Sequence, residues 1–285
     1  MPYASFLTYL NTSQNLFFIS PPYRILHRPL PYLMKQLLRF PQFLYCIYAL
    51  LAFIVCMLLV APFVVVASFF GKVRGGNVIY RICSTWGDVW FFLIGIHHRN
   101  LYEAPHDKNK QFIFVANHIS YFDAPVIVKT LRQPVRVLGK AEMSKVPVFG
   151  FIYRNAVVTV DRSSAEHRAR SVRILKSVIK KGISIFIFPE GTFNETNKPV
   201  KDFYDGAFRI AIETQTPIKP VLFLDAYSRM HYRSIFSLNP GRSRSVFLEE
   251  VPVAGLTPKD LPALRQQVYE IMERKLKEYK AAWIE

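Results

Sequence analysis

Residues 111–131 read QFIFVANHISYFDAPVIVKTL and join a short apolar strand, through a polar turn, to an amphipathic helix. β-Branched and aromatic residues predict the strand at 111–116, and the helix is predicted at 123–131. After His98 the same alternation continues to the end of the chain. It predicts further strands at 135–138, 156–160, 183–188, 218–224 and 245–251, and helices at 164–180, 203–214 and 259–281. Strands that alternate with helices indicate an α/β layered domain, which we place at 99–285.

The composition limits the classes of protein to which the chain can belong. Of 285 residues, 51% are hydrophobic and 20% are charged, which excludes a disordered chain. Lys and Arg outnumber Asp and Glu by 37 to 20, and the net charge of +17 favours a nucleic acid, an anionic membrane or a phosphorylated substrate as partner. A nucleic-acid binder is disfavoured, because the basic residues are scattered and no zinc-ligand spacing occurs. The three cysteines lack such spacing too, so we expect small buried side chains and no metal.

A long uncharged segment indicates that part of the chain is embedded in a membrane. From Phe40 to Gly71 there is no charged residue, and a bilayer core needs about 20 apolar residues. A single helix over 44–70 would be roughly 40 Å long, more than the ~30 Å core, and Pro62 is positioned to break it into two. Basic residues flank both ends, so the positive-inside rule selects neither side. A re-entrant hairpin with both ends in the cytoplasm fits these charges better than a single span, which stays the alternative.

The segments on either side of this stretch carry separate expectations. An N-terminal extension is placed at 1–39, where Met34 is an alternative start. Membrane-embedded or interfacial helices are placed at 40–98. Within them the apolar run 89–96 is too short to span a bilayer and suits an interfacial helix or the core.

The turn at 117–123 carries a histidine and an aspartate five residues apart. His118 and Asp123 would not share one face of a helix, but at a strand–turn–helix corner their side chains can meet. Asp123 would then accept a hydrogen bond from one imidazole nitrogen and leave the other as a base. The spacing alone is also compatible with an ordinary loop histidine near a helix-capping aspartate.

A second motif, FPEGT at 188–192, directly follows the apolar strand 183–188. Loops at the ends of strands are where substrate groups collect in α/β sheets. Glu190 can accept hydroxyl protons, and Gly191 lets the backbone approach a ligand closely. Thr192 offers a hydroxyl and a backbone N–H. The alternative is a β-turn with a solvated glutamate.

Two more motifs complete the series. VTVDR at 158–162 ends on Arg162, a residue type suited to bidentate binding of phosphate, and TPIKPV at 216–221 has two prolines that shape the entry to a strand. In this fixed order the four motifs resemble those of the glycerophospholipid acyltransferase family, in particular its 1-acylglycerol-3-phosphate acyltransferases. The resemblance covers roughly 75–255. One departure is at 193–196, where the family often has Arg or Ser soon after the threonine.

The resemblance implies a mixed central sheet flanked by helices and a phospholipid-synthesis enzyme. The activity it implies is transfer of an acyl chain from acyl-CoA or acyl carrier protein to the free hydroxyl of 1-acylglycerol-3-phosphate, which gives phosphatidate. His118 would remove the hydroxyl proton and Asp123 would orient the imidazole, with no metal or other cofactor. The substrate-binding residues would be Asn117, Lys140, Arg162, Glu190, Gly191 and Thr192.

Several alternatives stay open at this point. The acceptor could instead be glycerol-3-phosphate, a lysophospholipid or a lyso-aminolipid. A membrane-anchored thioesterase would use the same histidine and aspartate on water, and a non-catalytic lipid-binding protein would need neither. The basic helix at 164–181 would be a solvated face, or would contact anionic lipids or the acidic carrier protein. We expect a bacterial inner-membrane protein whose catalytic domain faces the cytoplasm, and the oligomeric state is left open.

Overall fold

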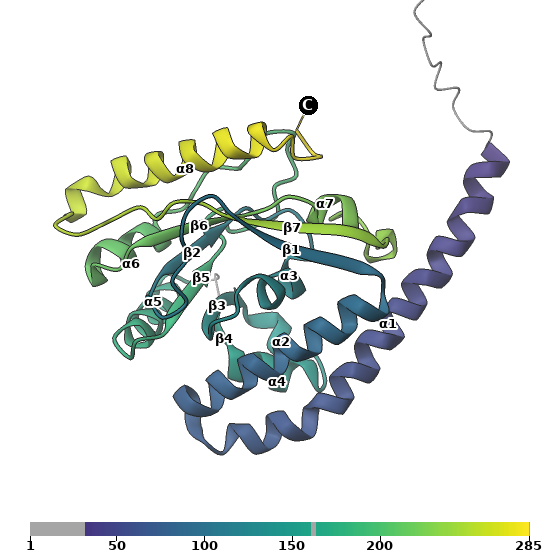
Figure 1. The fold of residues 1–285 in the computed structure, drawn as a ribbon. Helices are drawn as coiled ribbons and strands as arrows, with labels where there is room; N and C mark the ends of the chain where they lie inside the picture. Colours follow the sequence, from purple (N-terminus) through teal and green to yellow (C-terminus); the bar gives the residue numbers. More distant parts are fainter. Residues whose placement is uncertain (1–31, 161–163, 285) are drawn as a thin grey trace, which may run out of the picture.

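A seven-stranded sheet forms the centre of the molecule (Figure 1). The computed structural model describes residues 32–160 and 164–284. The strand order is β1-β7-β6-β2-β5-β3-β4. The strands are β1 Ile96–Tyr102, β2 Ile113–Ala116, β3 Val135–Lys140, β4 Val157–Val160, β5 Ser184–Ile187, β6 Ile218–Phe223 and β7 Gly241–Phe247.

The sheet is mixed, as predicted, and its larger part is parallel. β2 pairs in parallel with both β5 and β6, and β3 pairs in parallel with β4 and β5. β7 runs antiparallel to β6, and β1 lies at the edge in parallel with β7. The carboxyl ends of β2 to β6 therefore meet at one edge of the sheet, which is where loops of an α/β sheet collect ligands.

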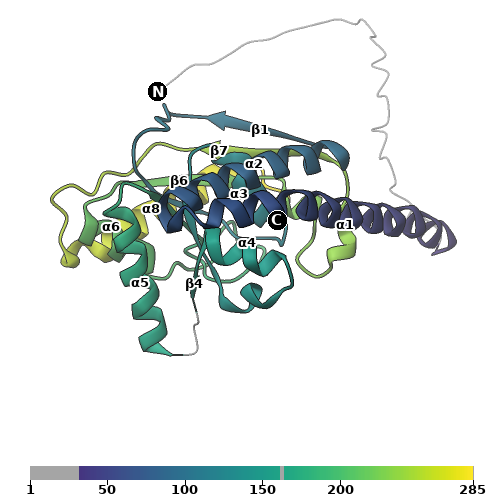
Figure 2. The same ribbon diagram turned by 90° about the horizontal axis from the view of Figure 1, so that it is seen from below.

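Helices cover both faces of the sheet (Figures 1 and 2). α5, α6 and α8 pack on one face, and α2, α3 and α4 lie against the other. Buried aliphatic and aromatic side chains of β2, β5 and β6 form the core between them. The helices are α1 Tyr32–Ser68, α2 Gly76–Leu93, α3 Asp123–Thr130, α4 Phe149–Ala156, α5 Ala165–Ile179, α6 Gly206–Thr214, α7 Ala226–Arg229 and α8 Leu261–Glu278. Shorter turns are η1 Gly71–Gly75, η2 Ala141–Lys145, η3 Ile235–Ser237 and η4 Pro258–Asp260.

The predicted elements are all present, with three differences. The last strand lies at 241–247 and not at 245–251, and beyond it Val251 forms only an isolated antiparallel bridge with Ile218. β1 was not predicted, since its sequence IHHRNLY is polar and its position at the sheet edge leaves half of its side chains exposed. α4 was not predicted either, because its eight residues are too few for a clear helical period.

α1 and α2 form a helical hairpin, but its turn is not at Pro62. α1 continues through both of its prolines, so the predicted break there is wrong. The chain reverses at the π-helix η1, and α2 then packs along α1. At this turn a Cβ on Gly75 would overlap the carbonyl oxygen of Ala67, so only glycine lets the backbones approach this closely. The predicted N-terminal extension lies outside the described residues up to position 31, and the helix begins at Tyr32.

A buried arginine fastens this hairpin to the sheet. Arg136 of β3 donates hydrogen bonds to the carbonyl oxygens of Lys72 and Val73, at 2.9 and 3.3 Å, and to Asn77 Oδ1 at 3.0 Å. The carbonyl groups at the end of a helix carry partial negative charge, so the guanidinium is a suitable partner for them. The turn of the hairpin is therefore hydrogen-bonded directly to the sheet.

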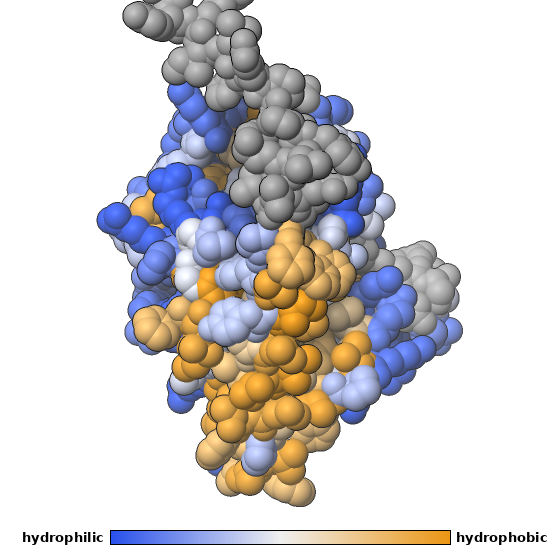
Figure 3. All heavy atoms as spheres, turned by 90° about the vertical axis from the view of Figure 1, so that its right-hand side faces the viewer, coloured by the Kyte–Doolittle hydropathy of each residue, from blue (hydrophilic) through white to orange (hydrophobic). Residues whose placement is uncertain are grey.

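The outer face of α1 is an apolar surface (Figure 3). Phe40–Ser68 is the one helix in the described part of the chain that is long and apolar enough to cross a membrane, with a mean hydropathy of 3.0. Its inner face packs on the rest of the protein through small and apolar side chains, among them Cys46, Ala49 and Val64. Trp90 of α2 is buried in the same contact, where its indole N–H donates to the carbonyl of Ala49 at 2.9 Å.

Candidate active site

The loops that follow β2 and β5 meet at the carboxyl edge of the parallel strands. β2 and β5 are hydrogen-bonded neighbours, with Phe114 opposite Phe186. The turn after β2 carries His118, and the loop after β5 carries Glu190. The backbone N–H of Asn194 donates to the carbonyl oxygen of His118 at 2.7 Å, which joins the two loops directly.

His118 and Asp123 form a hydrogen-bonded pair. His118 Nδ1 lies 2.8 Å from Asp123 Oδ2, and the same oxygen accepts the backbone N–H groups of Ile119 and Ser120 at 2.8 and 2.9 Å. Asp123 is fully buried at the first residue of α3, whereas 22% of the His118 side chain is exposed. A carboxylate can only accept, so Nδ1 donates to Asp123, and Nε2 is the ring nitrogen left to act as a base.

Aromatic rings fix the plane of His118. Its imidazole stacks on Phe188, with ring centroids 3.9 Å apart, and Phe193 meets it edge-on at 4.5 Å. Tyr121 in turn packs against Phe193. Phe193 lies at 193–196, where the sequence departs from the acyltransferase pattern. Its ring contacts His118, so this position contributes an apolar contact and not a polar ligand. These contacts leave the ring few orientations, which is what a positioned general base requires.

Glu190 has a different place from the one predicted. It is fully buried, and its two oxygens accept the backbone N–H groups of His118 and Lys201 at 2.7 and 2.8 Å. Burial raises the pKa of Glu190 to about 8, against the opposing effect of these two hydrogen bonds. The carboxyl joins the two loops and is fully buried, and the substrate contact expected for Glu190 stays a prediction.

Asn117 is also committed to the fold. Its Nδ2 donates to the carbonyl of Phe223 at 3.1 Å, and its Oδ1 accepts the N–H of the same residue at 2.8 Å. The side chain is 1% exposed, so it cannot reach a substrate. It replaces one step of the ladder between β2 and β6 at the point where these strands separate. Asn117 thus positions the turn, and the substrate contact expected for it stays a prediction.

The other predicted binding residues are dispersed. Gly191 has a φ of +72°, a left-handed backbone that favours glycine, and Thr192 is exposed beside it. Lys140 ends β3 with an exposed side chain 3.5 Å from Glu142. Arg162 lies outside the described residues.

Two residues of the site were not predicted from the sequence. Lys201 donates from Nζ to Thr192 Oγ1 at 2.8 Å. Ser120 accepts the N–H of Phe122, and its hydroxyl donates to the carbonyl of Met230 in the segment after α7. For Ser120 the signal was its place inside the histidine motif, whereas nothing in the local pattern singled out Lys201.

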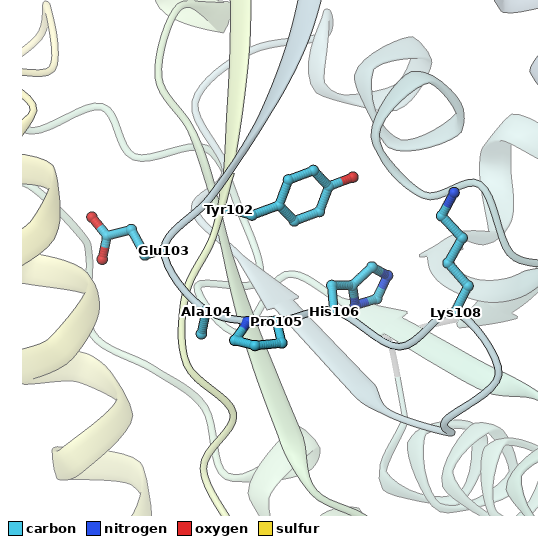
Figure 4. A pocket seen from close by; sticks show the side chains of 6 residues that line it. All are labelled: Tyr102, Glu103, Ala104, Pro105, His106 and Lys108. Atoms are coloured by element: carbon cyan, nitrogen blue, oxygen red, sulfur yellow. The ribbon is translucent and has the colours of Figure 1, made fainter.

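A separate hollow lies beyond the end of β1, at the opposite edge of the sheet from His118 (Figure 4). Tyr102, His106 and Lys108 point into it from one loop, and Glu103 points away. It does not include the motifs described above. In the described part of the chain, no three His, Cys, Asp or Glu side chains converge as metal ligands would.

The comparisons with known proteins agree with this architecture. A protein-family profile described as Acyltransferase matches residues 95–224. The chain is 28% identical to the 1-acyl-sn-glycerol-3-phosphate acyltransferase alpha of Mus musculus over 70% of this chain and 71% of that protein. It is 24% identical to the 1-acyl-sn-glycerol-3-phosphate acyltransferase of Haemophilus influenzae over 79% and 92% of the two chains.

Two further matches place the fold. An uncharacterized acyltransferase of Schizosaccharomyces pombe is 29% identical, over 60% of this chain, and the match spans 62% of that protein's length. The crystal structure of the 1-acyl-sn-glycerophosphate acyltransferase PlsC from Thermotoga maritima superposes with a TM-score of 0.67, at 24% identity, over 88% of this chain and all of that chain. Residues 95–224 thus match an acyltransferase family profile, and the sequence motifs and the sheet topology resemble those of the matched acyltransferases.

Proposed function

We propose that this protein transfers an acyl chain from a thioester to the free hydroxyl of 1-acylglycerol-3-phosphate, which gives phosphatidate. The observation that carries the proposal is the buried Asp123, whose Oδ2 lies 2.8 Å from Nδ1 of the partly exposed His118 and leaves Nε2 to act as the base. The relatives that bear this activity in their names support the choice of acceptor. The donor is acyl-CoA or acyl carrier protein.

His118 would act as a general base and then as a general acid. Nε2 takes the proton of the acceptor hydroxyl as its oxygen bonds to the thioester carbonyl carbon. The tetrahedral intermediate then collapses, the carbon–sulfur bond breaks, and the thiolate takes the proton back from Nε2. The products are an ester and a thiol, and no covalent intermediate on the protein is needed. A positioned general base accelerates such a step by about 10²–10⁴-fold.

Asp123 would stabilise the imidazolium that exists between these two proton transfers. Its Oδ2 already accepts two backbone N–H groups, so the carboxylate is held at one point before substrate binds. A preorganised charge of this kind needs no rearrangement during the reaction. Glu190 accepts the backbone N–H of His118 and so helps to fix the position of the turn that carries the base.

We further propose that the α1–α2 hairpin lies in the plane of one leaflet and does not cross the bilayer. The inner face of α1 is buried against the protein from Cys46 to Ala67, a length of about 32 Å. α2, which packs along it, carries the exposed Arg81, and Asp88 of α2 is paired with Arg132. Those charges would enter the hydrocarbon if α1 stood upright, and a charge at the bilayer centre is costly. The domain would thus sit on one face of the membrane, which in a bacterial inner membrane would be the cytoplasmic face.

The test is acyl transfer by the full chain in vesicles, for wild type, His118→Ala and the control His97→Ala, which removes an exposed histidine of β1. Each is given radiolabelled acyl-CoA or acyl carrier protein with lysophosphatidate, glycerol-3-phosphate or no acceptor. We expect phosphatidate from wild type and His97→Ala with lysophosphatidate, and at least 10²-fold less from His118→Ala. Free fatty acid without acceptor would instead assign a thioesterase, and activity retained by His118→Ala would refute the mechanism.

A further inference from the structure

The loop after β5 contains a lysine that lies outside the four motifs. Lys201 makes two contacts with the FPEGT stretch of the same loop: Nζ donates to Thr192 Oγ1 at 2.8 Å, and its backbone N–H donates to Glu190 Oε2 at 2.8 Å. The side chain and the backbone of Lys201 are thus both fixed to the same three-residue stretch. These two hydrogen bonds hold the lysine side chain in one orientation relative to the loop.

Among the residues that the structure describes, Lys201 has no ion-pair partner. None of the ion pairs formed within residues 32–160 and 164–284 includes it. Lys140, the lysine that was predicted for the site, lies 3.5 Å from Glu142. Over the same ranges, Lys201 contributes the one cationic side chain that is hydrogen-bonded to the FPEGT stretch at 188–192. An ammonium group has three N–H donors, and the contact with Thr192 uses one of them.

Lys201 is close to the base. Thr192, its partner, is followed directly by Phe193, whose ring touches the imidazole of His118 at 4.5 Å. Glu190 joins the backbones of Lys201 and His118 through its two oxygens. In lysophosphatidate the free hydroxyl and the phosphate stand on adjacent carbon atoms. When that hydroxyl is at Nε2 of His118, the phosphate must therefore lie within one side-chain length of it.

We propose that Lys201, together with the hydroxyl of Thr192, binds the phosphate of the acceptor and makes the site selective for phosphate-bearing acceptors. The inference rests on the proposed acyl transfer to lysophosphatidate. The two remaining N–H groups of Nζ point charge-assisted hydrogen bonds at the phosphate oxygens, and these are stronger than neutral ones. Thr192 accepts from Nζ and keeps its own proton for a third contact. A neutral monoacylglycerol, which has a hydroxyl in place of the phosphate, gains nothing from the ammonium.

The experiment compares wild type, Lys201→Ala, Lys201→Arg and Lys198→Ala in vesicles. Lys198 is the matched control, because it lies in the same loop with an exposed side chain. For each protein the KM is measured for lysophosphatidate, for 1-monoacylglycerol and for the acyl thioester. We expect Lys201→Ala to raise the KM for lysophosphatidate by about 10–100-fold, the range for loss of a hydrogen bond to a charged group, and to leave the other two unchanged. Lys201→Arg should recover most of the loss, and Lys198→Ala should match wild type.

The outcomes separate this inference from the proposed function. Wild type that makes no phosphatidate would overturn both. Wild-type activity with an unchanged KM for lysophosphatidate in Lys201→Ala would overturn the role of Lys201 alone. A raised KM for the thioester instead would also overturn it, because the ammonium would then bind a phosphate of the donor. If Lys201→Ala melts at a lower temperature than wild type, Lys201→Gln, which keeps a donor to Thr192, takes its place in the same comparison.

Discussion

Replacing Asp123 by asparagine separates the orientation of His118 from the stabilisation of its charge. Asp123 Oδ2 faces the Nδ1 of His118 and also accepts the N–H groups of Ile119 and Ser120. An amide nitrogen cannot occupy this point, because it would face two N–H donors. The amide oxygen of asparagine must therefore lie there, and the imidazole keeps its hydrogen bond and its plane.

The magnitude follows from what remains and what is lost. A hydrogen bond to a charged group contributes about 1.5–3 kcal/mol and a neutral one about 0.5–1.5 kcal/mol, so asparagine forfeits about 1–2 kcal/mol in the transition state. That corresponds to a kcat roughly 5–30-fold lower. The new NH2 group occupies the place of Oδ1, a buried atom with no partner among the described residues, which costs about 1–3 kcal/mol of stability. Asp123→Ala removes orientation as well and should lower kcat by about 10²–10⁴-fold.

The assay is kcat for phosphatidate formation in vesicles, with the thermal midpoint of each variant recorded alongside. Asp202→Asn serves as control, because Asp202 is an exposed aspartate just after Lys201. The double variant His118→Ala with Asp123→Ala should be no slower than His118→Ala alone, since residues that act as a unit are not additive. The reasoning is refuted if Asp123→Asn is as slow as Asp123→Ala at an unchanged midpoint, or if either is as fast as wild type.

Three further predictions concern the framework of the site. Burial raises the pKa of Glu190 to about 8, so its proton stabilises the folded state below about pH 4.5, and this contribution is lost as the pH rises through 8. Relative to Glu190→Gln, the free energy of unfolding of wild type should fall by about 1.4 kcal/mol per pH unit between pH 5 and 8. An equal pH dependence of the melting temperature in both proteins would contradict this. Gly75→Ala should lower the free energy of unfolding by about 1–3 kcal/mol, because the new Cβ overlaps the carbonyl oxygen of Ala67. Gly206→Ala, with open space around it, should be neutral or stabilising. Equal thermal midpoints of the two variants would count against the geometry of the hairpin turn. Asn117→Ala should lower the free energy of unfolding by about 1–3 kcal/mol, because it leaves the buried N–H and C=O of Phe223 unpaired. It should change the KM for lysophosphatidate little. A large rise in KM at unchanged stability would instead support a substrate contact for Asn117.

The hydrogen-bonded pair of His118 and Asp123 is the part of the site that the sequence could predict. His118 and Asp123 are five residues apart in one turn, so a strand before them and a helix after them suffice to bring their side chains together. The FPEGT loop was recognisable for the same reason, as a run of turn residues after an apolar strand. What these motifs could not show is which of their side chains face a substrate. Glu190 and Asn117 belong to them and are both buried.

Long-range contacts account for what was missed. Lys201 reaches Thr192 across a nine-residue turn, and Arg136 lies 64 residues from the carbonyl of Lys72 that it binds. Neither contact leaves a period or a spacing in the sequence. The course of α1 through Pro62 was missed in a similar way, because its packing against α2 and the sheet decides where the chain turns.

The sequence by itself determined the alternation of strands and helices, the apolar segment and the histidine turn, because each depends on residues within a few positions of one another. Only the tertiary structure decided how these parts act together. The parallel pairing of β2 with β5 brings Glu190 to the backbone of His118 over 72 residues, and this register follows from burial of both strands in a common core. The burial that builds the core also takes Glu190 out of solvent and leaves Lys201 at the surface of the loop. The chemistry of a side chain thus follows from the sequence, whereas its access to a substrate depends on which surfaces the fold buries.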